Sequence, residues 1–173
     1  TFWKSIVLPI PENNYSIGVT HVSEKKLNSD NLLEVIYNTY SAPNIRQSKI
    51  INEEGTVLLT VDNCYSLSMD EQQGLSTKII SKSANESKVY SVPEFILEHT
   101  YALGETKRVI LENAGEKYYN LDSTNGILTI YNNDHTFWKN ITLTKPQSYS
   151  FSGILFLSEN QVNDDNLLEI GYS

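Results

Sequence analysis

Two tryptophans and two tyrosines are the side chains in this sequence best suited to hold a ligand. Trp3 and Trp138 each open a strand-like segment, and each shares parity with polar positions rather than with the apolar Ile6 and Ile141. That parity predicts indoles that face solvent, where flat aromatic rings stack on the apolar faces of sugars. The alternative is that both indoles plug the end of a core, because large aromatic side chains are highly buried on average. The candidate ligand-binding residues are Trp3, Trp138, Tyr15 and Tyr149.

Two acidic loops gather oxygen ligands at short spacing. Calcium takes six to eight oxygens from carboxylates, amides and backbone carbonyls, and loops of Asp and Asn supply them. The spacing here matches no EF-hand. The alternative is a solvated turn in which Asp or Asn caps backbone groups. The candidate calcium ligands are Asp30, Asn31, Glu34, Asp164, Asp165 and Glu169.

No catalytic constellation stands out from the sequence. The three histidines are isolated from one another and from the single cysteine, so zinc is not expected. Cys64, a lone thiol beside Tyr65, is expected to be buried and inert. Carboxylates are plentiful, but nothing brings two of them to the separation that glycoside hydrolysis needs. We therefore predict a protein that is not an enzyme and that needs no cofactor, calcium aside.

These candidates lie within one unit that occurs twice. Thr1-Phe2-Trp3-Lys4 returns as Thr136-Phe137-Trp138-Lys139, and the Asp-Asn-Leu-Leu-Glu run at 30–34 returns at 165–169, at a constant offset of 135 residues. Agreement over about forty residues indicates internal duplication. Residues 1–40 and 136–173 should therefore be equivalent. We favour a single β-sandwich body over 1–173 that packs both copies. In the alternative, 1–135 is one tandem repeat domain and 136–173 begins the next.

Period-two alternation and regular turn signals predict an all-β protein. Strands are expected over 1–10, 15–22, 32–40, 56–61 and 65–69, and a hairpin over 121–130 turns at Asn125-Gly126. Residues 88–97 are expected to be extended, and 70–86 has room for one short helix. Short strands separated by turns every 8 to 12 residues are typical of an antiparallel sandwich of the jelly-roll kind.

Composition narrows the classes of partner. The 173 residues carry a formal net charge of −8, and no basic stripe is interleaved with aromatics, so nucleic acid is not an expected partner. No apolar run approaches the length of a transmembrane span. One cysteine excludes an internal disulfide and leaves the compartment open. The sequence begins on a strand-like segment, as expected of a piece excised from a longer protein.

The repeated unit, read from Ile141 to Ser173, resembles the opening strands of jelly-roll carbohydrate-binding modules and the lectin-like sandwich domains in tails of secreted bacterial toxins. The features that carry the resemblance are an apolar strand, a short turn, Tyr149-Ser150, a second strand, and an acidic loop before Leu167-Leu168-Glu169-Ile170. It implies a secreted, non-catalytic module of a toxin or adhesin that binds a glycan or a glycosylated receptor. The alternatives are a structural stalk or fibre repeat with further tandem copies, and a glycoside-acting enzyme.

Overall fold

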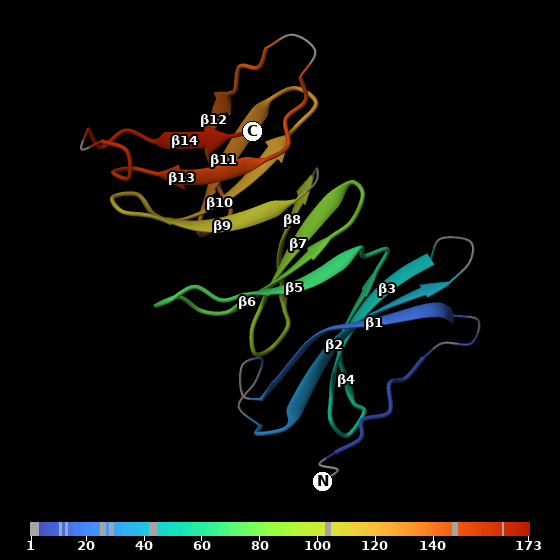
Figure 1. Cartoon of the computed structure of the whole chain (residues 1–173). Helices are drawn as coiled ribbons and strands as arrows, with labels where there is room; N and C mark the ends of the chain where they lie inside the picture. Colours follow the sequence, from blue (N-terminus) through green and yellow to red (C-terminus); the bar gives the residue numbers. More distant parts are fainter. Residues whose placement is uncertain are drawn as a thin grey trace. The chain divides into compact units, whose positions relative to one another are not determined.

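The fold is all-β and antiparallel, as predicted (Figure 1). The computed structural model describes residues 4–10, 12, 14–24, 27, 30–41, 45–102, 105–146, 149–163 and 165–173, and for 14–16 the backbone alone. Throughout those ranges the regular structure consists of strands, in three four-stranded sheets and one two-stranded sheet. The chain divides into two compact units, Thr1–Thr100 (unit 1) and Tyr101–Ser173 (unit 2).

Unit 1 is built from two meander sheets, in which neighbours along the chain are neighbours in the sheet. The first comprises β1 (Asn14–Glu24), β2 (Leu33–Ser41), β3 (Ile45–Asn52) and β4 (Val57–Asp62). The second comprises β5 (Ser66–Asp70), β6 (Lys78–Lys82), β7 (Glu86–Ser91) and β8 (Leu97–Ala102). The division between the units falls within β8.

The sheet β1–β4 buries apolar side chains on both of its faces. Ile36, Ile50 and Val61 cluster with Leu67 and Ile79 of the second sheet, so one face forms a sandwich core. On the other face Val35, Tyr37 and Ile51 pack against Ile6 and Leu8. A strand buried on both faces is enriched in apolar residues, and Leu33–Tyr37 is buried at every position, with Glu34 as its charged member.

Unit 2 forms its own sandwich from a four-stranded meander and a hairpin. The meander comprises β9 (Thr106–Leu111), β10 (Gly115–Asp122), β11 (Ile127–Asn132) and β12 (Phe137–Thr142). The hairpin comprises β13 (Ile154–Ser158) and β14 (Glu169–Tyr172). Leu111, Leu128, Ile130, Leu143 and Leu157 form the core between them. The predicted hairpin turn lies where expected, with Gly126 at a positive φ of 68°.

The hairpins of the two copies of the repeated unit adopt the same local structure. β1 pairs with β2 and β13 pairs with β14 in the same register once the offset of 135 is applied. Each hairpin is interrupted at the same place, between Val19 and His21 in one copy and between Ile154 and Phe156 in the other. The Tyr37 hydroxyl donates to the Pro9 carbonyl (3.0 Å), and the equivalent Tyr172 donates to Thr144 (2.8 Å). The duplication read from the sequence is therefore a duplication of structure.

Two expected elements differ from the structure. Residues 4–10 contain no strand, whereas Lys139–Thr142, the equivalents of residues 4–7, belong to β12, which is paired with β11. A strand needs a neighbouring strand to share its backbone hydrogen bonds, and residues 4–10 are in no ladder among the residues that the structure describes. The short helix considered for 70–86 was wrong, because β6 and the start of β7 lie there. Residues 88–97 are extended at both ends and turn at the cis peptide bond Val92-Pro93.

Candidate functional site

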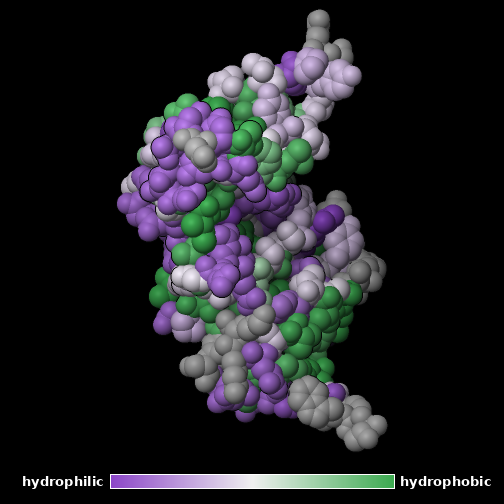
Figure 2. All heavy atoms as spheres, turned by 60° about the vertical axis from the view of Figure 1, so that its left-hand side comes forward, coloured by the Kyte–Doolittle hydropathy of each residue, from purple (hydrophilic) through white to green (hydrophobic). Residues whose placement is uncertain are grey.

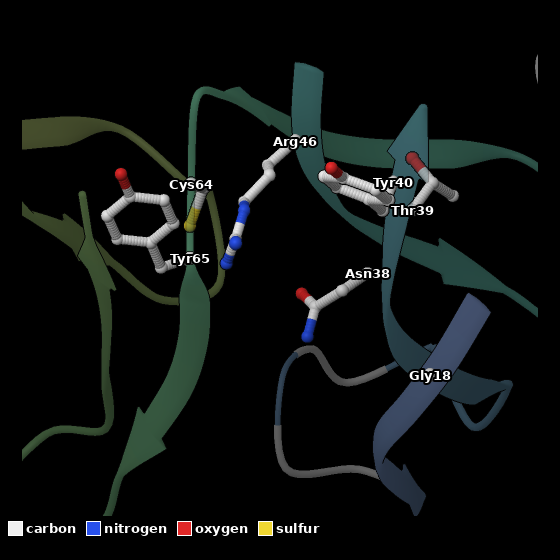
Figure 3. A pocket seen from close by; sticks show the side chains of 7 residues that line it. All are labelled: Gly18, Asn38, Thr39, Tyr40, Arg46, Cys64 and Tyr65. Carbon is white, nitrogen blue, oxygen red and sulfur yellow. The ribbon is translucent and has the colours of Figure 1, made fainter. Parts of the chain in front are cut away.

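A pocket of about 370 Å³ in unit 1 is the best candidate for a ligand site. It lies at the end of β1–β3, where Cys64 and Tyr65 lead into β5 (Figure 3). The pocket continues the face of the sheet that carries the sandwich core. Its volume is near the lower end of the range for small-molecule sites, which suits one sugar-sized group. The lining residues are Gly18, Asn38, Thr39, Tyr40, Arg46, Cys64 and Tyr65.

Strand register brings the sheet residues of the pocket together. Gly18 lies opposite Asn38 in the β1–β2 ladder, and Tyr40 lies opposite Arg46 in the β2–β3 ladder. Directly paired residues of antiparallel strands share a face. A side chain at Gly18 would meet nothing within 4 Å of its Cβ atom, so glycine there leaves the pocket floor open. The Ser48 hydroxyl donates to Asn38 Oδ1 (2.6 Å) and so orients the Asn38 amide.

Arg46 is the charged group of this pocket, and two tyrosine rings flank it. Its guanidinium carbon lies 4.5 Å from the ring centroid of Tyr65 and 5.5 Å from that of Tyr40. In Figure 3 the side chain extends from β3 into the space between Tyr65 on one side and Tyr40 and Asn38 on the other. Stacking on aromatic rings fixes the plane of a guanidinium and leaves its N–H fork able to bind a carboxylate at two points.

A second hollow of about 370 Å³ adjoins the first and shares Arg46 and Tyr65. Its other lining residues are Asn63, Ser83, Ala84, Asn85 and Glu86. Glu86 pairs with Lys88 at 2.6 Å, which offsets part of the negative charge on this side. The Arg46–Tyr65 pair thus forms a wall shared by two hollows, the second richer in polar side chains.

The Cys64 thiol borders the pocket but is poorly suited to nucleophilic chemistry. It is buried, and its sulfur hydrogen-bonds the Ser66 carbonyl (3.0 Å). Burial raises the pKa of the Cys64 thiol, which disfavours the reactive thiolate. The sequence-based expectation of a buried cysteine is confirmed.

The predicted aromatic residues do not line this pocket. Trp138 is half-buried and packs against the core of unit 2, with Lys139 Nζ 4.2 Å and Lys117 Nζ 5.2 Å from its ring centroid. Tyr149 is exposed over 67% of its surface. Trp3 and the side chain of Tyr15 lie outside the described residues. A ligand role for these four residues stays a prediction.

The acidic loops hold their own backbone in place. Asp30 Oδ1 accepts from the Leu32 amide (2.8 Å), and its equivalent Asp165 accepts from Leu167 (2.9 Å). Asn31 and Asn166 both adopt left-handed backbone, with φ of 62° and 59°. These hydrogen bonds are those of the capped turn that was the alternative to a calcium loop.

The two glutamates of these loops meet serine hydroxyls. Ser23 Oγ donates to Glu34 (3.2 Å), and the equivalent Ser158 Oγ donates to Glu169 (2.6 Å). Asp164 lies outside the described residues. Among the residues described, no three His, Cys, Asp or Glu side chains are grouped so as to hold a metal ion. Calcium binding by Asp30, Asn31, Glu34, Asp165 and Glu169 stays a prediction.

Comparison with other proteins assigns neither a family nor a function to the chain. No known protein family, curated protein or solved structure matches the chain. The described residues also contain no helix long and apolar enough to span a membrane.

Sequence reasoning did not find the pocket residues. Tyr40 and Arg46 come together through the β2–β3 register, and Tyr65 arrives from a separate turn. One feature of the sequence could have drawn attention to Arg46. The chain has only 13 Lys and Arg residues against 21 Asp and Glu, and Arg46 lies between Tyr40 and Tyr65 along the sequence. That Arg46 would lie beside Tyr40 depends on the β2–β3 register, which the alternation of apolar and polar residues alone does not determine.

Proposed function

We propose that the chain is a non-catalytic recognition module that binds a carboxylate-bearing saccharide in the Arg46 pocket. The stacked Arg46 guanidinium between Tyr65 and Tyr40 is the observation that supports this most directly. A guanidinium fork binds a sugar carboxylate through paired hydrogen bonds, and tyrosine rings pack against the apolar face of a pyranose. Asn38 adds an amide for a sugar hydroxyl.

The adjoining hollow would take the next sugar of an acidic glycan. Asn63, Ser83 and Asn85 supply hydroxyl and amide groups there, which suit a neutral sugar better than an anion. An acidic protein surface otherwise repels anions, so Arg46 would confine binding to one place. We place this activity on a secreted bacterial protein, such as a toxin or adhesin, on the sequence resemblance described above.

The test is a titration of the folded chain with glucuronic acid and with glucose, followed by amide chemical shifts. We expect shifts at Asn38, Arg46 and Tyr65 with the acid, and weaker ones with the neutral sugar. Arg46→Gln should reduce affinity about tenfold or more, because a charge-assisted hydrogen bond is worth about 1.5–3 kcal/mol. Lys107→Gln is the matched control, since Lys107 is an exposed cation of unit 2. Equal binding by Arg46→Gln, or none by the folded wild type to any acidic saccharide, would refute the proposal.

A second candidate function is a structural repeat of a stalk or fibre. The duplicated register and the duplicated tyrosine-to-carbonyl hydrogen bonds favour it, since arrays are built from units that keep the same local structure. This reading predicts several further copies at a period of 135 residues in the parent protein, whereas a tip module needs one or two. Reading the parent coding sequence distinguishes them.

A further inference from the structure

The two copies of the repeated hairpin differ in what covers one face. In unit 2, Leu157 of β13 is 7% exposed, because Leu111, Leu128 and Ile130 of the β9–β12 sheet pack over it. Its equivalent in unit 1, Val22 of β1, is 52% exposed. The same fold position is therefore core in one copy and surface in the other.

The exposed position belongs to a row of apolar residues that crosses the whole sheet. Val22 pairs with Val35, Val35 with Ile51, and Ile51 with Val57, so the four side chains share a face. Ile6 and Leu8 cover the middle of this face, while Val57 and Val19 are 45% and 53% exposed. Apolar surface is exposed on unit 1 in the lower part of Figure 2, in green. Monomers seldom expose contiguous apolar surface unless it binds something.

A polar group marks the same face. In unit 2, Glu159 is 7% exposed and its Oε2 accepts the backbone N–H groups of Asn113 (2.5 Å) and Ala114 (3.1 Å), in the turn between β9 and β10. The equivalent residue in unit 1, Glu24, is exposed. Glu24 thus lies where a turn of the Asn113–Ala114 kind is bound in the other copy.

Within the described residues, the backbone of residues 4–10 also lacks a ladder partner that its equivalent has in unit 2. The equivalents of residues 4–7 are Lys139–Thr142 of β12, which pair with Ile127–Ile130 of β11. Residues 4–10 lie against the sheet through Ile6 and Leu8, as Ile141 and Leu143 do in unit 2, but form no ladder among the described residues. Apart from the Pro9 carbonyl, which accepts from the Tyr37 hydroxyl, this backbone is outside any sheet in the described part of the chain, and such backbone is a template for strand addition.

We infer that this face of unit 1 binds a three-stranded sheet of the β9–β11 type, supplied by another repeat of this protein. Its third strand would pair with residues 4–7, its leucines and isoleucines would cover Val22 and Val19, and its first turn would donate to Glu24. This occupant is inferred from unit 2, where the β9–β11 strands make the equivalent apolar, turn and ladder contacts. The inference is independent of the saccharide proposed for the Arg46 pocket, so failure of either leaves the other standing.

The experiment joins a second copy of residues 101–135 in front of residue 1 of the full chain. This reproduces the native junction, because residue 135 directly precedes residue 136, the equivalent of residue 1. Hydrogen exchange is then compared between the extended and the unextended chain. We expect amide exchange over residues 4–10 and 14–24 to slow about tenfold or more, and the melting temperature to rise. The matched control carries Leu128→Asp and Ile130→Asp in the added copy alone and should lose the protection.

Glu24→Gln gives an independent readout. It should weaken the new protection in the extended chain and leave exchange in the unextended chain unchanged. Unchanged exchange over residues 4–10 in an extended chain that is otherwise folded would overturn the inference. So would an unextended chain that sediments as a dimer with residues 4–10 already protected, because a second whole copy would then cover the face.

Discussion

At the scale of single residues, Glu34 and Glu169 occupy equivalent positions of the repeat, but their pKa values are shifted in opposite directions. Glu169 accepts the Ser158 hydroxyl and, in addition, the backbone N–H groups of Gln161, Val162 and Asn163. The Ser158 hydroxyl has the largest effect and lowers the pKa of Glu169; burial, the next in size, raises it, and the three backbone donors lower it further, so that the net shift is downward. Burial instead raises the pKa of Glu34, which is fully buried and whose Oε1 has no hydrogen-bond partner in the described part of the chain.

We predict that Glu169→Gln destabilises unit 2 at neutral pH and has little effect in acid. The folded pKa of Glu169 is lowered, so its carboxylate stabilises the fold above the ordinary value of 4.5, and that contribution is lost as the pH falls through the folded pKa. Glutamine keeps one acceptor oxygen and leaves backbone donors at 161–163 unpaired. Thermal melts of both proteins from pH 3 to 8 should converge at the acid end. Parallel curves would contradict the argument.

Glu34→Gln should have the opposite effect and stabilise unit 1 at pH 7. A carboxyl whose folded pKa is raised binds more protons folded than unfolded, so the wild type loses stability as the pH rises above the ordinary value of 4.5. Glutamine carries no charge to desolvate and can still accept from Ser23. We expect a gain of about 1 kcal/mol at pH 7, absent below pH 4, measured by urea unfolding. A loss at pH 7 would show that the buried carboxylate has a partner.

At the scale of elements, one cross-strand pair shows how the two hairpins diverged. His21 faces Ile36 in β1–β2, and Phe156 faces Gly171 in β13–β14. Ile36 is fully buried in the sandwich core, whereas at Gly171 an added Cβ atom would run into the ring of Phe156. The Phe156 ring therefore lies over the glycine and fills the volume that the isoleucine side chain takes in the other copy.

We predict that Gly171→Ile destabilises unit 2, because the new side chain must displace the Phe156 ring, and that the cost is at the low end of the roughly 1–3 kcal/mol of core overpacking, because Phe156 is 37% exposed and can move toward solvent. Adding Phe156→His should recover part of the loss, since it restores the pair found in β1–β2. Phe156→His alone supplies the third corner of a double-mutant cycle read by chemical denaturation. Additive effects of the two changes would mean that the ring does not determine which residue fits at 171.

Sequence pattern predicted what depends on local alternation. The strands 15–22 and 32–40 and the turn at Asn125-Gly126 are all present. It failed where structure depends on distant partners. Residues 4–10 alternate like Lys139–Lys145 but lack the ladder that makes β12 a strand, and Arg46 meets Tyr65 through register and packing.

At the scale of the whole molecule, the duplicated hairpins differ at their outer edges. In unit 1, β2 is bonded to β1 on one side and to β3 on the other, so Val35 gains Ile51 as a paired neighbour. In unit 2, β14 pairs with β13, and no second strand is bonded to β14 within the described ranges. Ile170, the equivalent of Val35, is accordingly only partly buried. β14 is therefore an edge strand among those described, and its Ile170 matches Val35 of β2, an inner strand.

We therefore predict that residues 39–62, joined after Ser173, form two strands on the edge of β14. Residue 173 is equivalent to residue 38, so the junction preserves the repeat, and the added Ile51 would lie beside Ile170 as it does beside Val35. Strand addition satisfies the open backbone of β14 and buries apolar surface, so amides of Glu169–Tyr172 should exchange about tenfold more slowly. The same extension carrying Ile51→Asp in the added segment is the control. If neither extension slows amide exchange in β14, the edge of β14 does not accept a further strand as β2 does, and the prediction is wrong.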